Sequence, residues 1–383
     1  MEVAGRNGLS ARSDRSEPTL RDKIRKFMLE PYLDWAEGEG VPIYEDFAID
    51  MLSIETKPWA RFGLHGAICH LKGRDDFLTT FLNEIPPGGS GAPTHHIYEE
   101  VIYVLSGHGS TSVEINGKAH NFEWGPRSLF SVPLNATYRH FNASGREPAR
   151  LAATNNLTYL MNLFRNEGFI FENQQVFPER YERIGFLAGD GEYIEVIQGR
   201  HQWETNFIPD LANFELKAMP TRGAGGTSIR FILGEGSVGC HYSEIPAGTY
   251  KKGHRHMNGV VIHAVTGKGY SLLWYQGEKY FHRTDWQHGV IYSPPDQMFH
   301  QHFNISPRPA RYLAVQMGSV RYPMTQGKRD IWAPEGNFAK PISEGGMQIE
   351  YADQDPRIHE LWLEEMAKAR LEPRMDAFVK TKV

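Results

Sequence analysis

The chain contains two copies of one sequence unit, and this repeat constrains its fold more than any other feature. A shift of 160 positions places EIPPGGSGAPTHHIYEEVIYVLSGHG (84–109) on EIPAGTYKKGHRHMNGVVIHAVTGKG (244–269) without a gap. A shift of 162 positions places 133–142 on 295–304. The identical pairs are Glu84/Glu244, Ile85/Ile245, Pro86/Pro246, Gly88/Gly248, His96/His256, Val101/Val261, Ile102/Ile262, Gly107/Gly267, Gly109/Gly269, Pro133/Pro295, His140/His302, Phe141/Phe303 and Asn142/Asn304. Self-similarity at a fixed period indicates one structural unit built twice.

The repeated region has the pattern of a β protein. Short apolar runs alternate with Gly, Pro and Asn from about residue 61, and the pattern resumes between about 226 and 320. The clearest strand segments are FLTTFLNEI, EEVIYVLSG, STSVEING and RSLFSVP. INGK at 115–118 predicts a hairpin, because Asn-Gly suits a two-residue turn.

Helices are expected at both ends of the chain. From Pro18 onward, apolar residues recur at helical spacing up to Met28. Near the C-terminus, Asp355 and Pro356 have the character of a helix start. The apolar face that follows comprises Ile358, Leu361, Trp362 and Met366. Between the copies, residues 155–215 indicate a linker with some helix that packs on the repeated units.

Composition and charge restrict the partners. The chain of 383 residues has a net charge of −5, with 40% apolar and 23% charged residues. This balance is ordinary for a soluble globular protein and argues against nucleic acid as the main partner. No apolar run is long enough to span a bilayer, and the first residues lack the apolar segment of a secretory signal. We therefore expect a cytoplasmic protein without a membrane partner, in which Cys69 and Cys240 stay reduced.

Three histidines of the second copy have the spacing of metal ligands. His254 and His256 are two positions apart, which on a strand places both imidazoles on one face. His300 follows shortly after a Pro-Pro pair. Three neutral imidazoles that converge on one point form a site for a divalent metal.

The repeated motifs resemble those of the cupin superfamily, and their double occurrence resembles a bicupin. The motifs of that family are G-x5-H-x-H-x3-4-E-x6-G and G-x5-P-x-G-x2-H-x3-N. His254 and His256 match the first motif, while His300 and Asn304 match the second. The resemblance implies an all-β fold of two jelly-roll β-barrels with peripheral helices at both termini. The expected parts are an N-terminal helical arm (1–60), a first barrel (61–160), a linker (161–220), a second barrel (221–322) and a tail with a helix (323–383).

The second copy departs from the family at the glutamate position, where Val260 stands. A set of three histidines and one glutamate is typical of cupin oxalate decarboxylases, whereas three histidines alone resemble gentisate-type ring-cleaving dioxygenases and thiol dioxygenases. The resemblance therefore implies Fe(II) and insertion of O2 into a small aromatic or enolic acid, as in the degradation of aromatic compounds. Nitrogen ligation also admits Mn, Ni, Cu or Zn. A non-oxidative lyase, isomerase or decarboxylase and a non-catalytic ligand-binding bicupin are the two alternatives.

The first copy retains only part of the ligand set. Thr94 and Tyr138 replace two of the histidines, while His96 and Glu100 remain. We expect this copy to lack metal or to bind it weakly. An irregular site made by His96, Glu100 and His140 is the competing hypothesis.

Further residues are candidates for the surroundings of the second site. His302 is either a catalytic acid/base or a packing residue, because His140 repeats it in the first copy. Arg230 is a candidate to clamp a substrate carboxylate, with a surface salt bridge as the commoner role. Tyr242, Trp274 and Gln316 are candidates to line the substrate pocket. The family resemblance also implies a homodimer or a higher homo-oligomer.

Overall fold

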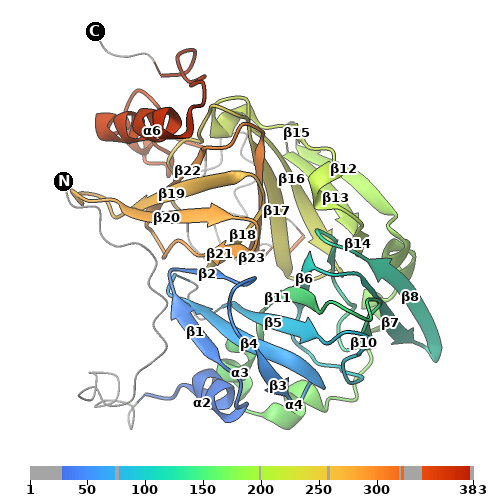
Figure 1. Ribbon diagram of the computed structural model, residues 1–383. Coiled ribbons are helices and arrows are strands. Elements are labelled where there is room, and N and C mark those ends of the chain that lie inside the picture. The colour runs from blue at the N-terminus through green and yellow to red at the C-terminus, as the bar shows by residue number, and fades with distance from the viewer. Residues whose placement is uncertain are drawn as a thin grey trace.

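The computed structural model describes residues 28–379 except 74–76, 198–199, 257–258, 319–320 and 323–338. The helix expected from Pro18 therefore lies almost wholly outside the described residues. A helix is present near that end, α2 (Pro31–Gly38), and the chain then forms two β-rich units, one above the other in Figure 1.

The first unit consists of a large and a small sheet. The large sheet contains β1 (Ile43–Asp46), β3 (Lys57–Trp59), β4 (Leu64–Leu71), β5 (Thr79–Ile85), β6 (Glu100–Ser106), β9 (Leu129–Phe130), β11 (Ala149–Asn155) and β14 (Phe207–Ile208). The small sheet contains β7 (Gly109–Ile115), β8 (Lys118–Trp124) and β10 (Thr137–Asn142). In the sequence, the segment after the first unit contains α3 (Leu157–Phe164), α4 (Glu167–Phe171) and the 3-10 turns Pro178–Arg180 and Ile184–Ala188. In space, α3 and α4 pack beside α2 on the first unit (Figure 1).

The second unit repeats this plan. Its large sheet contains β2 (Ala48–Asp50), β12 (Gly191–Ile197), β13 (Arg200–Thr205), β15 (Lys217–Ala218), β16 (Thr227–Leu233), β17 (Val238–Ile245), β18 (Val260–Thr266), β21 (Val290–Tyr292) and β23 (Ala310–Met317). Its small sheet contains β19 (Lys268–Trp274), β20 (His282–Gln287) and β22 (Phe299–Asn304). The strand order matches that of the first unit, which confirms the all-β fold of two jelly-roll units. Each unit is a two-sheet sandwich rather than the closed barrel that we expected, because its sheets are separate hydrogen-bonded ladders.

The structure extends the repeat beyond the segments that align in sequence. β1 pairs in parallel with β4 as β13 does with β16, and β3 and β15 pair antiparallel with the same two strands. The next strand crosses to the other unit in each copy, since β2 joins β21 and β14 joins β9. The two units therefore exchange a strand. The duplicated unit starts at β1 and β13, in segments that the sequence placed in the arm and the linker, so our domain limits stay a prediction.

One arginine in each copy fixes the segment that follows the exchanged strand. Arg150 binds Glu84 at 2.6 Å, and Arg311 binds Glu244 at 2.7 Å. Each guanidinium also donates to three backbone carbonyls: Met51, Leu52 and Ile54 in the first copy, and Leu211, Ala212 and Phe214 in the second. The identical Glu84 and Glu244 of the repeat are thus explained by a structural role.

The predicted hairpin and the predicted C-terminal helix are both present. Asn116 and Gly117 connect β7 and β8 with φ angles of 51° and 71°, the left-handed values that a two-residue turn of this type requires. Asp355 caps α6 (Pro356–Ala369) by accepting a hydrogen bond from the Arg357 amide at 3.0 Å. The buried face of α6 covers the outer side of the small sheet of the second unit, and its members are Ile358, Trp362 and Met366.

The two units pack through the outer faces of their large sheets, where apolar side chains from both form one core. His263 lies in this interface, 1% exposed, and its Nε2 lies 2.9 Å from Thr154 Oγ1 of the other unit. His263 therefore faces away from the interior of its own unit.

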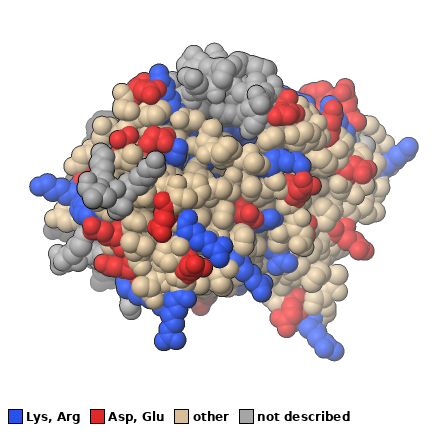
Figure 2. Space-filling view, turned by 90° about the horizontal axis from the view of Figure 1, so that it is seen from above, with Lys and Arg blue, Asp and Glu red and all other residues tan. Residues whose placement is uncertain are grey.

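No helix in the described part of the chain is long and apolar enough to cross a membrane. Basic and acidic side chains are interspersed over the face shown in Figure 2.

Candidate metal centre

His254, His256 and His300 come together inside the second unit. His254 and His256 lie in the connection between β17 and β18, and His300 lies on β22. His254 and His300 are backbone partners, with N–O distances of 3.0 and 2.8 Å. One ligand atom of each of the three side chains lies within 4.8 Å of the others. In the described residues, this is the group that could hold a metal ion.

In His254 and His300, a hydrogen bond at Nδ1 leaves Nε2 available to bind a cation. His254 Nδ1 lies 3.2 Å from the Lys252 carbonyl, and His300 Nδ1 lies 3.2 Å from the Met298 carbonyl. A carbonyl oxygen can only accept, so Nδ1 carries the proton and Nε2 keeps its lone pair. Such a contact fixes the tautomer and the orientation of a metal-binding imidazole.

Burial keeps the imidazoles of His254 and His300 neutral. Burial lowers the pKa of His300 to about 4 and lowers the pKa of His254 well below its ordinary value. The nearby guanidinium of Arg222 lowers the pKa of both histidines further. Because a metal binds only the neutral form, this donor set fits a divalent cation.

The surroundings of the centre are basic rather than acidic. Val260, at the family's glutamate position, is 2% exposed and stands opposite Gln316 in the sheet. After burial, the main influences on the pKa of His302 are the neighbouring bases His300, Lys251 and His241. In the part of the chain that the structure describes, no carboxylate completes the group of three histidines.

In the first unit, the corresponding groups bind one another. Thr94 and Tyr138 form the same backbone bridge as His254 and His300. The Tyr138 hydroxyl donates to Glu100 at 2.7 Å and lies 3.0 Å from His96 Nε2. Burial alone raises the pKa of Glu100, but the adjacent His96 and the hydrogen bond from Tyr138 outweigh burial and lower the pKa. The tyrosine therefore fills the place of the third imidazole.

The competing site of His96, Glu100 and His140 does not form a comparable ligand group. In the described part of the chain, the ligand atoms of His96, Glu100 and His140 do not all lie within 4.8 Å of one another, as those of the three histidines in the second unit do. His140 is instead held at Nδ1 by Thr111 Oγ1 at 2.8 Å.

His302 has the same support as His140. Ser271 Oγ lies 2.8 Å from His302 Nδ1, as Thr111 Oγ1 does from His140. A tryptophan donates to each hydroxyl, Trp286 at 3.1 Å and Trp124 at 2.9 Å. The arrangement is thus part of the duplicated scaffold. The His302 ring nevertheless lies 5.4 Å from the His300 ring, close enough to contact a molecule bound at the centre.

Comparison with known proteins supports the family of the first unit. Residues 81–155 match the family model of the cupin domain. This cupin domain covers β5 to β11, the unit without the three histidines. The two units share their strand order, so the second unit has the cupin fold as well. No curated protein matches the chain.

Several solved structures of oxalate decarboxylase from Bacillus subtilis are similar to the chain. Two of these structures, one of a deletion mutant and one from work on the Mn(II) centres of the enzyme, are each 14% identical to this chain with a TM-score of 0.46. The matched region covers 71% of this chain and 77% of the oxalate decarboxylase chain. Its structure at pH 4.6 shows 13% identity, a TM-score of 0.45, and coverage of 71% and 76%. Similarity this low transfers no chemistry to the present chain.

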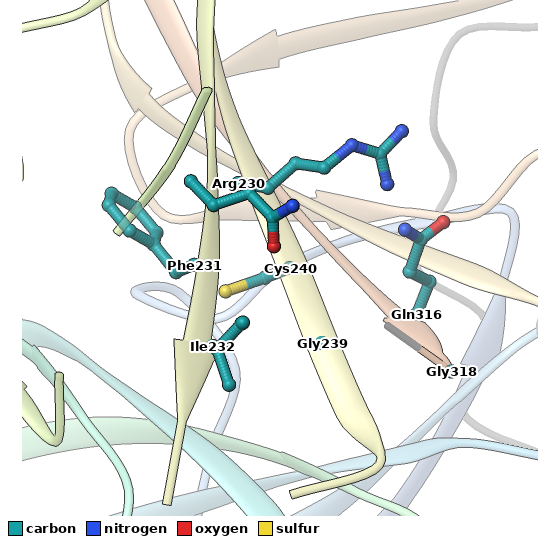
Figure 3. A pocket seen from close by; sticks show the side chains of 8 residues that line it. Arg230, Phe231, Ile232, Gly239, Cys240, Gln316 and Gly318 are labelled. Atoms are coloured by element: carbon teal, nitrogen blue, oxygen red, sulfur yellow. The ribbon is translucent and has the colours of Figure 1, made fainter. Parts of the chain in front are cut away.

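Arg230 and Gln316 extend to the same side of the large sheet (Figure 3). Both line a small pocket together with Gln202. The Cys240 sulfur extends to the opposite side, toward the interface between the units (Figure 3). Arg230 and Gln316 therefore share one side of the sheet, and their roles as substrate clamp and pocket-lining residue stay predictions.

Tyr242 and Trp274 lie elsewhere, which corrects our expectation that they line the pocket. Tyr242 belongs to the core between the two units, and Trp274 packs on Phe281 and Phe299 in the cluster beneath α6. Side chains alternate along a strand, so the inward neighbour of Tyr242 is His241.

Sequence reasoning missed three groups inside the second unit: Lys251, Tyr312 and His241. Lys251 is 4% exposed and donates to the Tyr312 hydroxyl at 3.0 Å. The signal available in the sequence was the contrast between copies, because Gly91 stands where Lys251 stands in the second copy.

Proposed function

We propose that the chain is a metal-dependent enzyme whose centre is formed by His254, His256 and His300. Its reaction is the insertion of O2 into a small aromatic or enolic acid, with gentisate-type ring cleavage as the leading case. The observation that carries this proposal is a set of three convergent imidazoles with Val260, not a carboxylate, at the fourth position.

The metal that we propose is Fe(II), with Mn, Ni, Cu and Zn as the alternatives to be tested. A divalent ion at this centre would supply open positions for substrate oxygens and O2 side by side, so that the reactants meet on one ion. Without a ligating glutamate, the protein adds no negative charge there, which favours an anionic substrate.

The residues of the chain have defined tasks in this proposal. His254 and His300 present Nε2 because backbone carbonyls hold Nδ1. Burial of both imidazoles excludes water and prevents their protonation near neutral pH. Arg230, which lines a small pocket on the inner side of β16, is our candidate to attract an anionic substrate into the second unit. His302, next to His300, is the nearest candidate to hold a proton of a substrate hydroxyl.

The test is metal analysis of the protein purified without added metal, followed by oxygen-electrode measurements. Anaerobically Fe(II)-loaded protein is mixed with a panel of hydroxylated aromatic acids and enolic acids. We expect oxygen consumption with at least one acid, and none with the His256→Ala or His300→Ala variant. Absence of oxygen consumption with every acid by protein that holds one iron would refute the dioxygenase proposal.

A non-oxidative lyase or decarboxylase is the second candidate. Such a reaction needs a proton donor for a carbanion, and Lys251 and the Tyr312 hydroxyl offer two inside the same unit. Product formation under nitrogen at an undiminished rate would support this candidate over the dioxygenase. If the chain is a non-catalytic binding protein, we expect neither oxygen uptake nor product.

The expected homodimer or higher homo-oligomer is a separate proposal, which light scattering of the purified protein tests.

A further inference from the structure

We propose that Lys251, Tyr312 and His241 form an anion-binding subsite beside the metal centre, and that this subsite receives the carboxylate of the substrate. The inference rests on the proposed function and deepens it by naming the substrate class. That class is a compact organic acid with a carboxylate at one end and an enol, phenol or alcohol oxygen at the other.

Lys251 is a buried cation with a neutral partner. Its side chain is 4% exposed. The Nζ donates a hydrogen bond to the Tyr312 hydroxyl at 3.0 Å and lies 4.8 Å from the centre of the Tyr312 ring. Among the residues that the structure describes, no carboxylate pairs with it. A buried ammonium ion without a counter-ion is costly unless a ligand supplies the charge.

The comparison between the two copies shows that this arrangement is specific to the second unit. Lys251 corresponds to Gly91 and His241 to Phe81 under the shift of 160 positions. Tyr312 pairs with Ser243 in β17, as Leu151 pairs with Asn83 in β5, so Tyr312 corresponds to Leu151. The first unit thus has glycine, phenylalanine and leucine at the three positions where the unit with the three histidines has lysine, histidine and tyrosine.

The subsite lies next to the metal centre. The Tyr312 ring is 5.0 Å from the His302 ring and 6.2 Å from the His241 ring. The His302 ring is in turn 5.4 Å from the ring of His300. Two such steps connect Tyr312 with the metal ligand His300, and Lys251 contacts Tyr312 directly.

His241 supplies a further polar group with an open position. Its Nδ1 is buried and has no hydrogen-bond partner among the described residues. Burial and the neighbouring Arg230 and Lys251 lower its pKa well below the ordinary value, so the imidazole is neutral and Nδ1 or Nε2 can donate to an acid. An unsatisfied buried donor beside an uncompensated cation favours an anionic ligand over a neutral one.

The test measures the preference of the full-length chain for acids over their neutral amides. Isothermal titration calorimetry under nitrogen compares 2-hydroxybenzoate with 2-hydroxybenzamide, and 2-hydroxypropanoate with 2-hydroxypropanamide, using Fe(II)-loaded and metal-free protein. We expect at least one acid to bind the wild type more tightly than its amide. Lys251→Met should weaken acid binding roughly 10- to 100-fold and leave amide binding unchanged. Tyr312→Phe, which removes only a hydroxyl, should weaken acid binding less.

Lys252→Met is the matched control, because this neighbouring lysine points to Glu350 at 2.5 Å and lies outside the subsite. The proposal is overturned if neither acid is preferred over its amide, or if Lys251→Met and Lys252→Met have the same effect. The two proposals fail separately. If metal-free wild type prefers the acid and Lys251→Met loses that preference, the subsite stands even when no oxygen is consumed. If wild type consumes oxygen with an acid and Lys251→Met binds that acid equally well, the subsite is refuted and the proposed function stands.

Discussion

Replacing both Thr94 and Tyr138 by histidine should give the first unit a metal site. The backbone already has the required form, since Thr94 and Tyr138 exchange hydrogen bonds of 2.9 and 2.8 Å where His254 and His300 exchange bonds of 3.0 and 2.8 Å. His96 presents Nε2, because its Nδ1 lies 2.8 Å from the Tyr98 carbonyl. Glu100 stands at the position of Val260 and would complete a set of three histidines and one glutamate.

The double substitution should destabilise the metal-free protein. It removes the Tyr138 hydroxyl, which lies 2.7 Å from Glu100 and 3.0 Å from His96. A hydrogen bond with a charged group contributes about 1.5–3 kcal/mol, so we expect a loss of that size when the bond to Glu100 is removed. A divalent ion at 100 times its dissociation constant should return about 2.7 kcal/mol.

Metal analysis and thermal unfolding with and without Zn(II) test this prediction. The double variant should hold one metal equivalent more than the wild type, and Zn(II) should raise its Tm by more than that of the wild type. Tyr138→Phe is the control, because it removes the hydroxyl but adds no ligand, so its loss of stability should persist with metal. A folded double variant with the metal content of the wild type would refute the idea that Thr94 and Tyr138 alone separate the two sites.

Three further predictions concern the second unit and its support. Val260→Glu should tighten metal binding against a chelator and reduce oxygen uptake more than tenfold, because the carboxylate would occupy a position needed by substrate or O2; an unchanged rate would contradict the proposed chemistry. His263, whose pKa burial lowers to about 3, is neutral in the folded protein. In the unfolded chain this histidine gains a proton below about pH 6.5. The free energy of unfolding should therefore decrease as the pH is lowered from about 6.5 to about 3, by up to about 1.4 kcal/mol per pH unit. His263→Gln keeps a polar group for Thr154 and should flatten that slope in denaturant titrations between pH 4.5 and 7, whereas an equal slope would show that other groups cause it. Asp355→Ala should cost about 1 kcal/mol by removing the cap of α6, seen as a lower Tm; Asp355→Asn, which can still cap, should recover most of it.

The identical residues of the repeat turned out to be mostly scaffold. Asn142 and Asn304 each donate from the side-chain amide to three backbone carbonyls, at 2.8–3.1 Å in the first copy and 2.9–3.2 Å in the second. Glu84 and Glu244 hold the arginines that fix the exchanged segments. The chemistry that we propose depends instead mainly on positions where the copies differ, such as Tyr138 against His300, although the proposed ligand His256 is identical to His96. Comparison of the two copies of a repeat therefore separates residues that maintain the fold from residues that form the candidate site.

The sequence alone determined the two-unit β architecture, the Asn116-Gly117 turn, the cap of α6 and the three candidate ligands. These features depend on local periodicity, on turn chemistry, or on comparison of one copy with the other, all of which are present in the linear chain.

Only the tertiary structure decided which other side chains surround the centre. Tyr242 and His241 are neighbours on β17, and the face that each occupies depends on the pairing of that strand with β16 and β23. A shift of one residue would exchange them. Lys251 lies in an irregular connection that has no periodicity, so its burial beside Tyr312 follows from contacts across 61 positions of the chain. The exchange of β2 and β14 between the units is likewise a long-range pairing of short strands, for which no local pattern exists.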